Sequence, residues 1–361
     1  MKVLVTGASG FVGSNLIVKL RQQGQAVTAA SRSRIEQLGI VYVRSPELGP
    51  KADWSEALTG IEAVVHLAGL AHIRPGKNQR EAWQKYLRIN TEGSARLVEQ
   101  CLTAGVKHFV FLSSCHAVAS ESDELLTDRT VPHPVTDYGR SKLAAEEATK
   151  STLADSDCAW TILRPPLVYG PGNKANFGLL VKLVKMGIPL PLAAVRNRRS
   201  FIYVENLVDL VATCLGNPKA FGKTFLPSDG DDLSTAELIE KIARANESVQ
   251  CPVSSDSLPS KATRHTVGRR GELFALGPSA VPLRSGSPHS SHVTRHTSLP
   301  PRLFPFPESI LKALGHLPGL GALRKLTSSI YVDSEPIRRE LGWTPPFTME
   351  EGLRRTLAKR H

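Results

Sequence analysis

The sequence has few cysteines, few aromatic residues and no hydrophobic run long enough to cross a membrane. Its five cysteines are scattered over 361 residues and form no Cys-x-x-Cys pair. This argues against a metal cluster or a disulfide framework and favours a reducing compartment. No apolar stretch approaches the ~20 residues of a transmembrane helix, and a strand-like run at residue 2 leaves no secretory signal. We therefore expect a cytoplasmic globular protein of one or two domains.

Acidic residues are outnumbered by basic ones, and the net charge is +12. Such a charge could serve binding to nucleic acid or to an anionic membrane surface. The sequence contains no nucleic-acid recognition motif that would support the first reading. We interpret the charge as that of a protein whose substrate and cofactor are polyanions, without a nucleic-acid partner and without membrane insertion.

A strand, a glycine turn and a helix follow one another near the N-terminus. The apolar run 3–5 precedes Gly7, Gly10 and Gly13, and apolar residues at helical spacing follow from Ser14. Gly7 permits a tight turn, Gly10 lets the backbone approach phosphates, and Gly13 lets the helix pack closely on the strand. No Gly-Lys-Ser/Thr follows, which excludes a phosphate loop of the ATPase kind. The residues expected to contact a dinucleotide pyrophosphate are Gly7, Ser9, Gly10, Phe11, Val12 and Gly13.

Strand and helix patterns alternate beyond this loop. Strands are expected at 25–30, 41–43, 63–68, 108–112 and 160–164, and helices at 79–104 and 138–150. This order predicts an α/β fold, a Rossmann-type doubly wound parallel sheet with helices on both faces. We expect residues 1–168 to form the dinucleotide-binding domain. Residues 169–361 would form a smaller α/β substrate-binding portion, with some elements returning to the sheet.

The end of the predicted strand 25–30 lacks an acidic residue. An Asp or Glu ~20 residues beyond the glycine loop usually binds the ribose hydroxyls of NAD. Here residues 31–34 read Ser-Arg-Ser-Arg. Arg32 could pair with the 2′-phosphate of NADP, because a guanidinium matches phosphate geometry; otherwise it is a solvated loop residue. The sequence slightly favours NADP over NAD.

A second constellation combines Ser114, at the end of the strand 108–112, with Tyr138 and Lys142. Tyr138 and Lys142 are four residues apart on a predicted helix and therefore share one face. Phenol and ammonium groups both titrate near ~10. A nearby ammonium and an oxidised nicotinamide would favour the phenolate. Tyr138 is thus the candidate acid and base, and Ser114 the candidate partner of the same substrate oxygen.

Several segments together resemble a known family. They are the Thr-Gly-Ala-Ser-Gly-Phe-Val-Gly loop, His-Leu-Ala-Gly at 66–69, Phe-Leu-Ser-Ser at 111–114, Tyr-Gly-Arg-Ser-Lys at 138–142, Leu-Arg-Pro-Pro-Leu-Val-Tyr-Gly-Pro-Gly at 163–172, Arg-Ser-Phe-Ile-Tyr-Val-Glu-Asn-Leu-Val at 199–208 and Glu-Leu-Gly-Trp-Thr-Pro-Pro-Phe at 340–347. The chain resembles the extended short-chain dehydrogenase/reductases, in the branch of NAD(P)-dependent nucleotide-sugar epimerases, dehydratases and reductases. The resemblance covers about 1–250 and 300–357.

The resemblance implies roles for particular residues. The catalytic residues would be Ser114, Tyr138 and Lys142, although the family's serine could instead align with Cys115. Further cofactor contacts would come from Leu67, Ala68, Gly69, Asn90, Tyr138, Lys142 and Pro165. For Asn90 a structural capping role is an equal alternative. The residues implied to bind a UDP-sugar are Ser114, Tyr138, Asn176, Phe177 and Arg199. Arg199 would bind the pyrophosphate, because charge-assisted pairs between arginine and phosphate are strong. A homodimer is also implied.

Three functions remain open. The first is reduction at C4 of a UDP-4-keto-6-deoxy-N-acetylhexosamine for cell-surface polysaccharide synthesis. The second is 4-epimerisation of UDP-glucose or UDP-N-acetylglucosamine, and the third is a non-catalytic NAD(P)-binding scaffold. A net reductase exchanges its cofactor, which fits NADPH, whereas an epimerase keeps NAD bound. Dehydration is disfavoured, because Cys115 and His116 stand where a dehydratase has an acidic pair.

Residues 252–300 depart from the family's pattern. They are rich in Ser, Pro, Arg and His, with Asp256 and Glu272 as the acids, and they show no sustained period. This composition predicts a disordered insertion or a long loop. The spacing of its histidines, which are His265, His289, His292 and His296, fits no standard metal site, so we expect no metal.

Overall fold

We describe the fold from a computed structural model of the chain. The structure describes residues 1–35, 39–71, 79–173, 176–250, 306–307, 309–311, 324 and 326–358. The predicted insertion at 252–300, with its histidines, lies outside the described residues.

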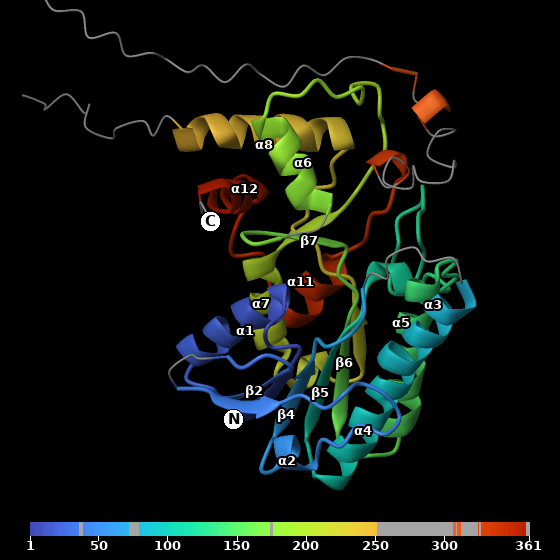
Figure 1. Ribbon diagram of the computed structural model, residues 1–361, viewed down its shortest axis with the longest axis vertical. Coiled ribbons are helices and arrows are strands. Elements are labelled where there is room, and N and C mark those ends of the chain that lie inside the picture. The colour runs from blue at the N-terminus through green and yellow to red at the C-terminus, as the bar shows by residue number, and fades with distance from the viewer. Residues whose placement is uncertain are drawn as a thin grey trace, which may run out of the picture.

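A seven-stranded sheet in the order β3-β2-β1-β4-β5-β6-β9 occupies the centre of the larger part of the molecule (Figure 1). Its strands are β1 (Lys2–Thr6), β2 (Ala26–Ser31), β3 (Val41–Arg44), β4 (Ala63–His66), β5 (His108–Leu112), β6 (Ala159–Leu163) and β9 (Lys223–Phe225). Every pairing in it is parallel. The predicted strands are confirmed to within two residues, and β9 was not predicted. Strand order reverses between β1 and β4, where α/β folds of this kind bind ligands beyond the carboxyl ends.

Alternating residues of the strands pack against helices on the two faces of the sheet. Val3 and Val5 of β1 pack with Leu16 and Leu20 of α1 in one buried cluster, and Leu4 belongs to the cluster on the opposite face. The first face carries α1 (Phe11–Gln22), α7 (Val204–Cys214) and α11 (Glu335–Leu341); the second carries α2 (Ser55–Leu58), α4 (Gly93–Thr103) and α5 (Asp137–Leu153) (Figure 1). A sheet buried on both faces explains the nearly continuous apolar strands, and the predicted doubly wound fold is confirmed.

The helix expected at 79–104 is one continuous helical stretch with an irregular centre. It consists of α3 (Gln79–Tyr86), a π-helical segment η1 (Leu87–Glu92) and α4. A π-helical turn inserts an extra residue into the helix and often occurs at functional sites. Here η1 contains Asn90, one of the predicted site residues.

A smaller part lies beyond the carboxyl ends of the strands and is drawn at the top of Figure 1. It contains the parallel pair β7 (Leu167–Tyr169) and β8 (Phe201–Tyr203) with α6 (Asn176–Lys185), α8 (Thr235–Gln250) and α12 (Met349–Ala358). The short turn η3 (Pro218–Ala220) leads back into β9 of the large sheet. The chain therefore crosses from the sheet to the smaller part and returns to it.

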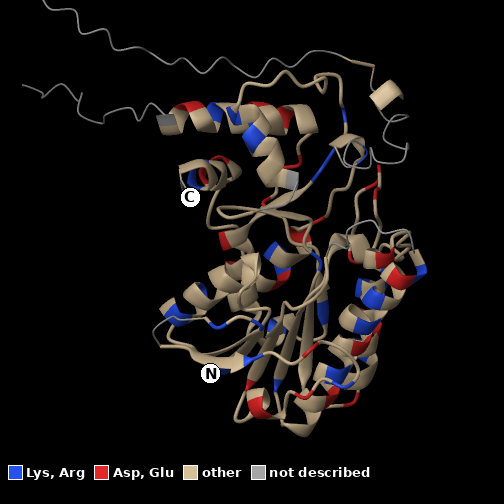
Figure 2. Cartoon of the chain, viewed as in Figure 1, with Lys and Arg blue, Asp and Glu red and all other residues tan. Residues whose placement is uncertain are grey.

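The polar surface is mixed in sign. Lys and Arg positions are interspersed with Asp and Glu along the helices in the view of Figure 2. None of the helices that the structure describes is both long and apolar enough to span a bilayer.

His66 at the end of β4 is a neutral group buried in the core. Its Nδ1 lies 2.7 Å from the Thr6 hydroxyl and its Nε2 lies 2.9 Å from the Ser94 hydroxyl. Its ring stacks on Phe111 at a centroid distance of 5.6 Å. Burial, with a smaller contribution from the Lys142 charge, lowers the pKa of His66 to about 3.

We predict that His66→Gln weakens the pH dependence of folding. The pKa of an unfolded histidine is about 6.5, so between that pH and about 3 the unfolded chain holds a proton that native His66 does not. The free energy of unfolding therefore decreases as the pH falls through this window. The variant should reduce this slope by about 1.4 kcal/mol per pH unit in urea unfolding between pH 6 and 4. Equal slopes in both proteins would contradict the prediction.

Candidate active site

The glycine loop is a tight turn between β1 and α1 that admits no side chain at two positions. Gly7 has φ +67°, and a Cβ there would lie 2.8 Å from the Ala68 nitrogen. A Cβ at Gly13 would lie 2.4 Å from the Gly7 carbonyl oxygen. The amide of Gly10 donates to that same oxygen at 2.9 Å. The structure thus places the loop after β4, which contains the predicted Leu67, Ala68 and Gly69, directly against the glycine turn.

The start of α1 is open to a ligand. Ser9 and Gly10 are exposed, and Phe11 and Val12 are half-buried. The first backbone N–H groups of a helix have no intrahelical acceptor and carry partial positive charge. This geometry suits the pyrophosphate of a dinucleotide, as the sequence predicts.

Ser114, Tyr138 and Lys142 come together where α5 packs against the end of β5. Ser114 caps the short turn η2 (Cys115–Ala117), and its Oγ accepts from the His116 amide at 3.2 Å. The Ser114 hydroxyl is also close enough to the Tyr138 phenol to lower the pKa of that group, against the larger raising effect of burial. Gly139 makes this approach possible, since a Cβ there would lie 2.2 Å from the His116 carbonyl oxygen. Sequence reasoning missed Gly139, although it stands beside Tyr138 in the quoted motif.

Lys142 is a buried amine one helical turn from Tyr138 on α5, and it is held by the end of β5. The Lys142 Nζ donates to the Leu112 carbonyl at 2.7 Å and lies 4.1 Å from the centroid of the Phe111 ring. Burial lowers the pKa of Lys142 to about 7, and the Glu146 carboxylate acts in the opposite direction. Burial raises the pKa of Tyr138 to about 12, and the Ser114 hydroxyl acts against this rise. In this arrangement Tyr138 holds its proton at neutral pH and is poised to donate it.

Asn90 fastens the loop after β4 to α5. Its Oδ1 accepts from the Leu70 amide at 2.7 Å, and its Nδ2 donates to the Leu70 carbonyl and the Ser141 hydroxyl, each at 3.0 Å. A Cβ on Gly69 would lie 3.2 Å from the Asn90 Oδ1. Through these bonds Asn90 shapes the backbone at 69–70, and its predicted contact with the cofactor stays a prediction.

Arg32 lies exposed just beyond β2, where the adenosine end of a dinucleotide is expected. In the register of β2 and β3, Ser31 pairs with Arg44. Arg44 is also exposed at its strand end. Arg32 and Arg44 therefore stand at the carboxyl ends of two neighbouring strands, β2 and β3.

The predicted substrate residues are divided between the site and the core. Arg199 joins two segments through backbone bridges to Leu233 and Ile330, and its Nη1 donates to the Ser328 carbonyl at 3.2 Å. Its charge acts on the thiol of Cys115 and lowers the pKa of that group, against the larger raising effect of burial. Arg199 thus lies near the residue that follows Ser114.

The remaining predicted site residues are Phe177, Pro165 and Asn176. The Phe177 side chain is buried in the core of the smaller part, 5.3 Å from the Tyr169 ring centroid. Its predicted contact with the nucleotide of a UDP-sugar stays a prediction. Pro165 is buried, and its carbonyl accepts from the Cys115 amide at 3.0 Å. The side chain of Asn176 lies outside the described residues.

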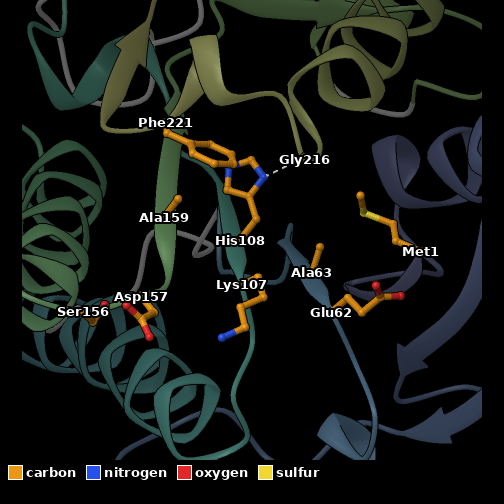
Figure 3. A pocket seen from close by; sticks show the side chains of 10 residues that line it. All are labelled: Met1, Glu62, Ala63, Lys107, His108, Ser156, Asp157, Ala159, Gly216 and Phe221. Carbon is orange, nitrogen blue, oxygen red and sulfur yellow. Dashed lines mark hydrogen bonds between the residues drawn. The ribbon is translucent and has the colours of Figure 1, made fainter.

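A hollow of about 420 Å³ lies at the opposite edge of the sheet, near the amino ends of β4, β5 and β6 (Figure 3). His108 lines it, with Nδ1 accepting from the Gly216 amide at 3.1 Å and Nε2 lying 3.0 Å from the Thr161 hydroxyl. Ligands of doubly wound sheets bind at the carboxyl edge. The hollow is therefore separate from the site at Ser114 and Tyr138.

Comparisons with known proteins agree with this geometry. Residues 3–225 match the NAD dependent epimerase/dehydratase family. The chain is 31% identical over 359 residues to a UDP-glucose 4-epimerase of Vibrio cholerae, covering 98% of this chain and 94% of the relative. The fold is similar to MoeE5 in complex with UDP-glucuronic acid and NAD (TM-score 0.69, 23% identity, 98% and 96% of the two chains). It is also similar to the UDP-glucose 4-epimerase of Thermotoga maritima with UDP-glucose (TM-score 0.67, 20% identity, 99% and 97%).

We predict that Gly13→Ala weakens cofactor binding more than it weakens the fold. The added Cβ would push against the Gly7 carbonyl and displace the turn that faces the pyrophosphate. Fluorescence titration with NADH and NADPH should show at least about a tenfold loss of affinity, equivalent to ~1.4 kcal/mol.

The matched control is Gly105→Ala. Gly105 has φ +74° with open space around a Cβ, so this variant costs about 1–2 kcal/mol of stability at a distance from the cofactor loop. It should bind cofactor with parental affinity. Equal affinities for the two alanine variants would contradict the role assigned to Gly13.

Proposed function

Because the chain belongs to the NAD-dependent epimerase/dehydratase family and has the features of a nucleotide-sugar enzyme of this family, we propose that it transfers hydride at C4 of a UDP-sugar. The net reaction we propose is reduction of a UDP-4-keto-6-deoxy-N-acetylhexosamine, as in cell-surface polysaccharide synthesis. The observation that carries the C4 chemistry is the meeting of Ser114, Tyr138 and Lys142 at the carboxyl edge of the sheet. These groups fit a nicotinamide cofactor bound along the glycine turn.

Each of the three side chains has a separate role in the proposed reduction. A reduced nicotinamide cofactor held along the glycine turn at Gly7, Gly10 and Gly13 would supply the hydride for the new C–H bond at C4. Tyr138 donates its phenolic proton to the C4 oxygen, so the carbonyl becomes a hydroxyl. Ser114 hydrogen-bonds to the same oxygen and orients it. The Lys142 ammonium stabilises the resulting phenolate until a proton from solvent restores the phenol.

The form of the cofactor that we propose is NADP. Arg32 and Arg44 are exposed at the ends of β2 and β3. Residues 31–35 contain no carboxylate for the ribose hydroxyls. Guanidinium groups recognise phosphate through paired hydrogen bonds. A net reductase also needs a cofactor that exchanges, and the 2′-phosphate would then meet these two side chains. NAD is the alternative cofactor, because the similar structure of MoeE5 contains NAD.

The proposed substrate site lies between the trio and the smaller part. Arg199 would bind the UDP pyrophosphate through charge-assisted hydrogen bonds. The Arg199 charge acts on Cys115, the residue after Ser114. Ser114 would contact the sugar. MoeE5 in complex with UDP-glucuronic acid offers the same overall fold for such a ligand. We further propose a cytoplasmic location, in keeping with the buried free cysteines among the described residues. The homodimer that we propose rests on the family resemblance alone.

A 4-epimerase is the second candidate. The relative from Vibrio cholerae, which matches nearly the whole chain, is named UDP-glucose 4-epimerase. Tyr138 would then take the proton of the C4 hydroxyl and return it after the keto sugar is reduced on its other face. The intact constellation of Ser114, Tyr138 and Lys142 argues against a non-catalytic scaffold.

The deciding assay offers the purified protein UDP-4-keto-6-deoxy-N-acetylglucosamine and NADPH. We expect a decrease of absorbance at 340 nm that depends on the sugar, with a weaker response to NADH. UDP-glucose and UDP-N-acetylglucosamine should remain unchanged in chromatography. Sugar-independent absorbance together with interconversion of UDP-glucose and UDP-galactose would overturn the reductase and support the epimerase.

We predict that Tyr138→Phe lowers kcat by about 10²–10⁴-fold, the usual contribution of a general acid. Cofactor affinity should be retained, because the ring remains in place. The matched control is Tyr331→Phe, since the Tyr331 hydroxyl donates to the Asp123 carbonyl on the surface and its loss should leave kcat at the parental value. Parental turnover in Tyr138→Phe would exclude Tyr138 as the proton donor.

A further inference from the structure

Residues 112–114 at the end of β5 each contact one residue of α5. The three residues of α5 are spaced four apart along the helix. The Leu112 carbonyl accepts from Lys142, and the Ser114 hydroxyl lies close to the Tyr138 phenol. Between them, the Ser113 hydroxyl donates to a carboxylate oxygen of Glu146. Tyr138 and Lys142 are the proposed acid and its partner, but the third member of this row has no part in the reaction described above.

Glu146 is a fully buried carboxylate in an ion pair with Arg164. Glu146 is 0% exposed and Arg164 is 4% exposed. The Arg164 Nε lies 3.1 Å from both carboxylate oxygens, and its Nη2 lies 2.6 Å from one of them. Burying two charges is costly, and an apolar pair of similar volume often stabilises a protein at least as well. Stability alone is therefore a weak reason for this pair.

Glu146 acts directly on the charge of Lys142. The two residues lie one helical turn apart on the same face of α5. Burial lowers the pKa of Lys142 to about 7, and the Glu146 carboxylate raises it. Without that carboxylate the ammonium would lose its proton at a lower pH.

We propose that Glu146 is a positioning residue of the reaction: it fixes the end of β5 through Ser113 and keeps Lys142 protonated next to Tyr138. This inference rests on the proposed function, since it assigns Lys142 the task of stabilising the Tyr138 phenolate. Arg164 in turn holds the Glu146 carboxylate in one orientation through three hydrogen bonds.

None of the other titratable groups described around Lys142 supplies a negative charge in place of the Glu146 carboxylate. His66 of β4 is neutral above pH about 3, and it faces Lys142 closely enough to feel its charge. Tyr138 on α5 carries its proton at neutral pH. Arg164 beyond β6 is a cation and therefore cannot supply a negative charge. Glu146 is thus the anion that acts on Lys142 among the described residues.

The test compares Glu146→Gln with Glu147→Gln. Glu147 is the exposed neighbour on α5, so the matched control makes the same chemical change away from the site. In Glu146→Gln the alkaline limb of the kcat profile should move down by about one pH unit, a tenfold change in the protonation equilibrium of Lys142. Glu147→Gln should keep the parental profile. Glu146→Asp, which restores the charge, should return the limb towards the parental pH.

A second readout needs no turnover. The rate at which acetic anhydride labels Lys142, followed by mass spectrometry from pH 6 to 10, reports the pKa of its amine directly. We expect the labelling midpoint to move down by the same unit in Glu146→Gln and to stay in Glu147→Gln. Should the unpaired Arg164 unfold the single variant in circular dichroism, Glu146→Gln with Arg164→Gln removes both charges and is expected to show the same direction of shift.

The outcomes separate the inference from the proposed function. A parental labelling midpoint in folded Glu146→Gln, or in the double variant, would overturn the inference. Lower kcat with an unshifted alkaline limb would do the same, because it would reveal a structural role alone. If the parent protein lacks activity on UDP-sugars, the proposed function fails, while the labelling midpoint still decides whether Glu146 controls Lys142.

Discussion

The site depends on the contact between α5 and the carboxyl end of β5. Gly139 allows the helix to approach until the His116 carbonyl would touch any side chain at that position. Once the helix is at this distance, its i, i+4 spacing brings Tyr138 to Ser114 and Lys142 to the Leu112 carbonyl. The helix also closes the second face of the sheet, because Ala145 and Leu153 pack into its buried cluster. The same packing therefore stabilises the fold and aligns the proposed acid with its cation.

Parallel strand order joins this contact to the cofactor loop. β1 and β5 both neighbour β4, so the glycine turn and Ser114 reach one edge of the sheet although they are distant in sequence. The loop after β4 lies between them, pressed against Gly7 and fastened to α5 by Asn90. A displacement of any of these three segments would shift the other two. The contact at Gly7 is too tight for an added methyl group, and the bonds of Asn90 would be broken.

Local patterns in the sequence were sufficient for the glycine turn and for the strands of the sheet other than β9. Each depends on residues within a few turns of one another, so spacing alone predicts them. The burial of Phe177 and the contacts of Asn90 could not be predicted in this way. Both follow from tertiary packing. Phe177 of α6 packs on Tyr169 of the preceding strand β7, and Asn90 bonds to Leu70 and Ser141, which lie farther away in the sequence. The same holds for the pair of Glu146 and Arg164, because neither residue has a motif that names its partner.

The smaller part is attached to the reacting end of β5 rather than to a remote surface. Val118 and Cys115 share a buried cluster with Ile330 and Val332. The segment at 330 also bridges the backbone of Arg199. Reductases and epimerases both need a proton donor at C4, so the roles proposed for Ser114 and Tyr138 are the same in either reaction. What separates the two reactions is how the sugar ring is presented and whether the cofactor leaves. Because the segments that would hold the nucleotide pack directly on η2, small changes in them can alter the presentation of C4 while the proton-transferring groups stay fixed.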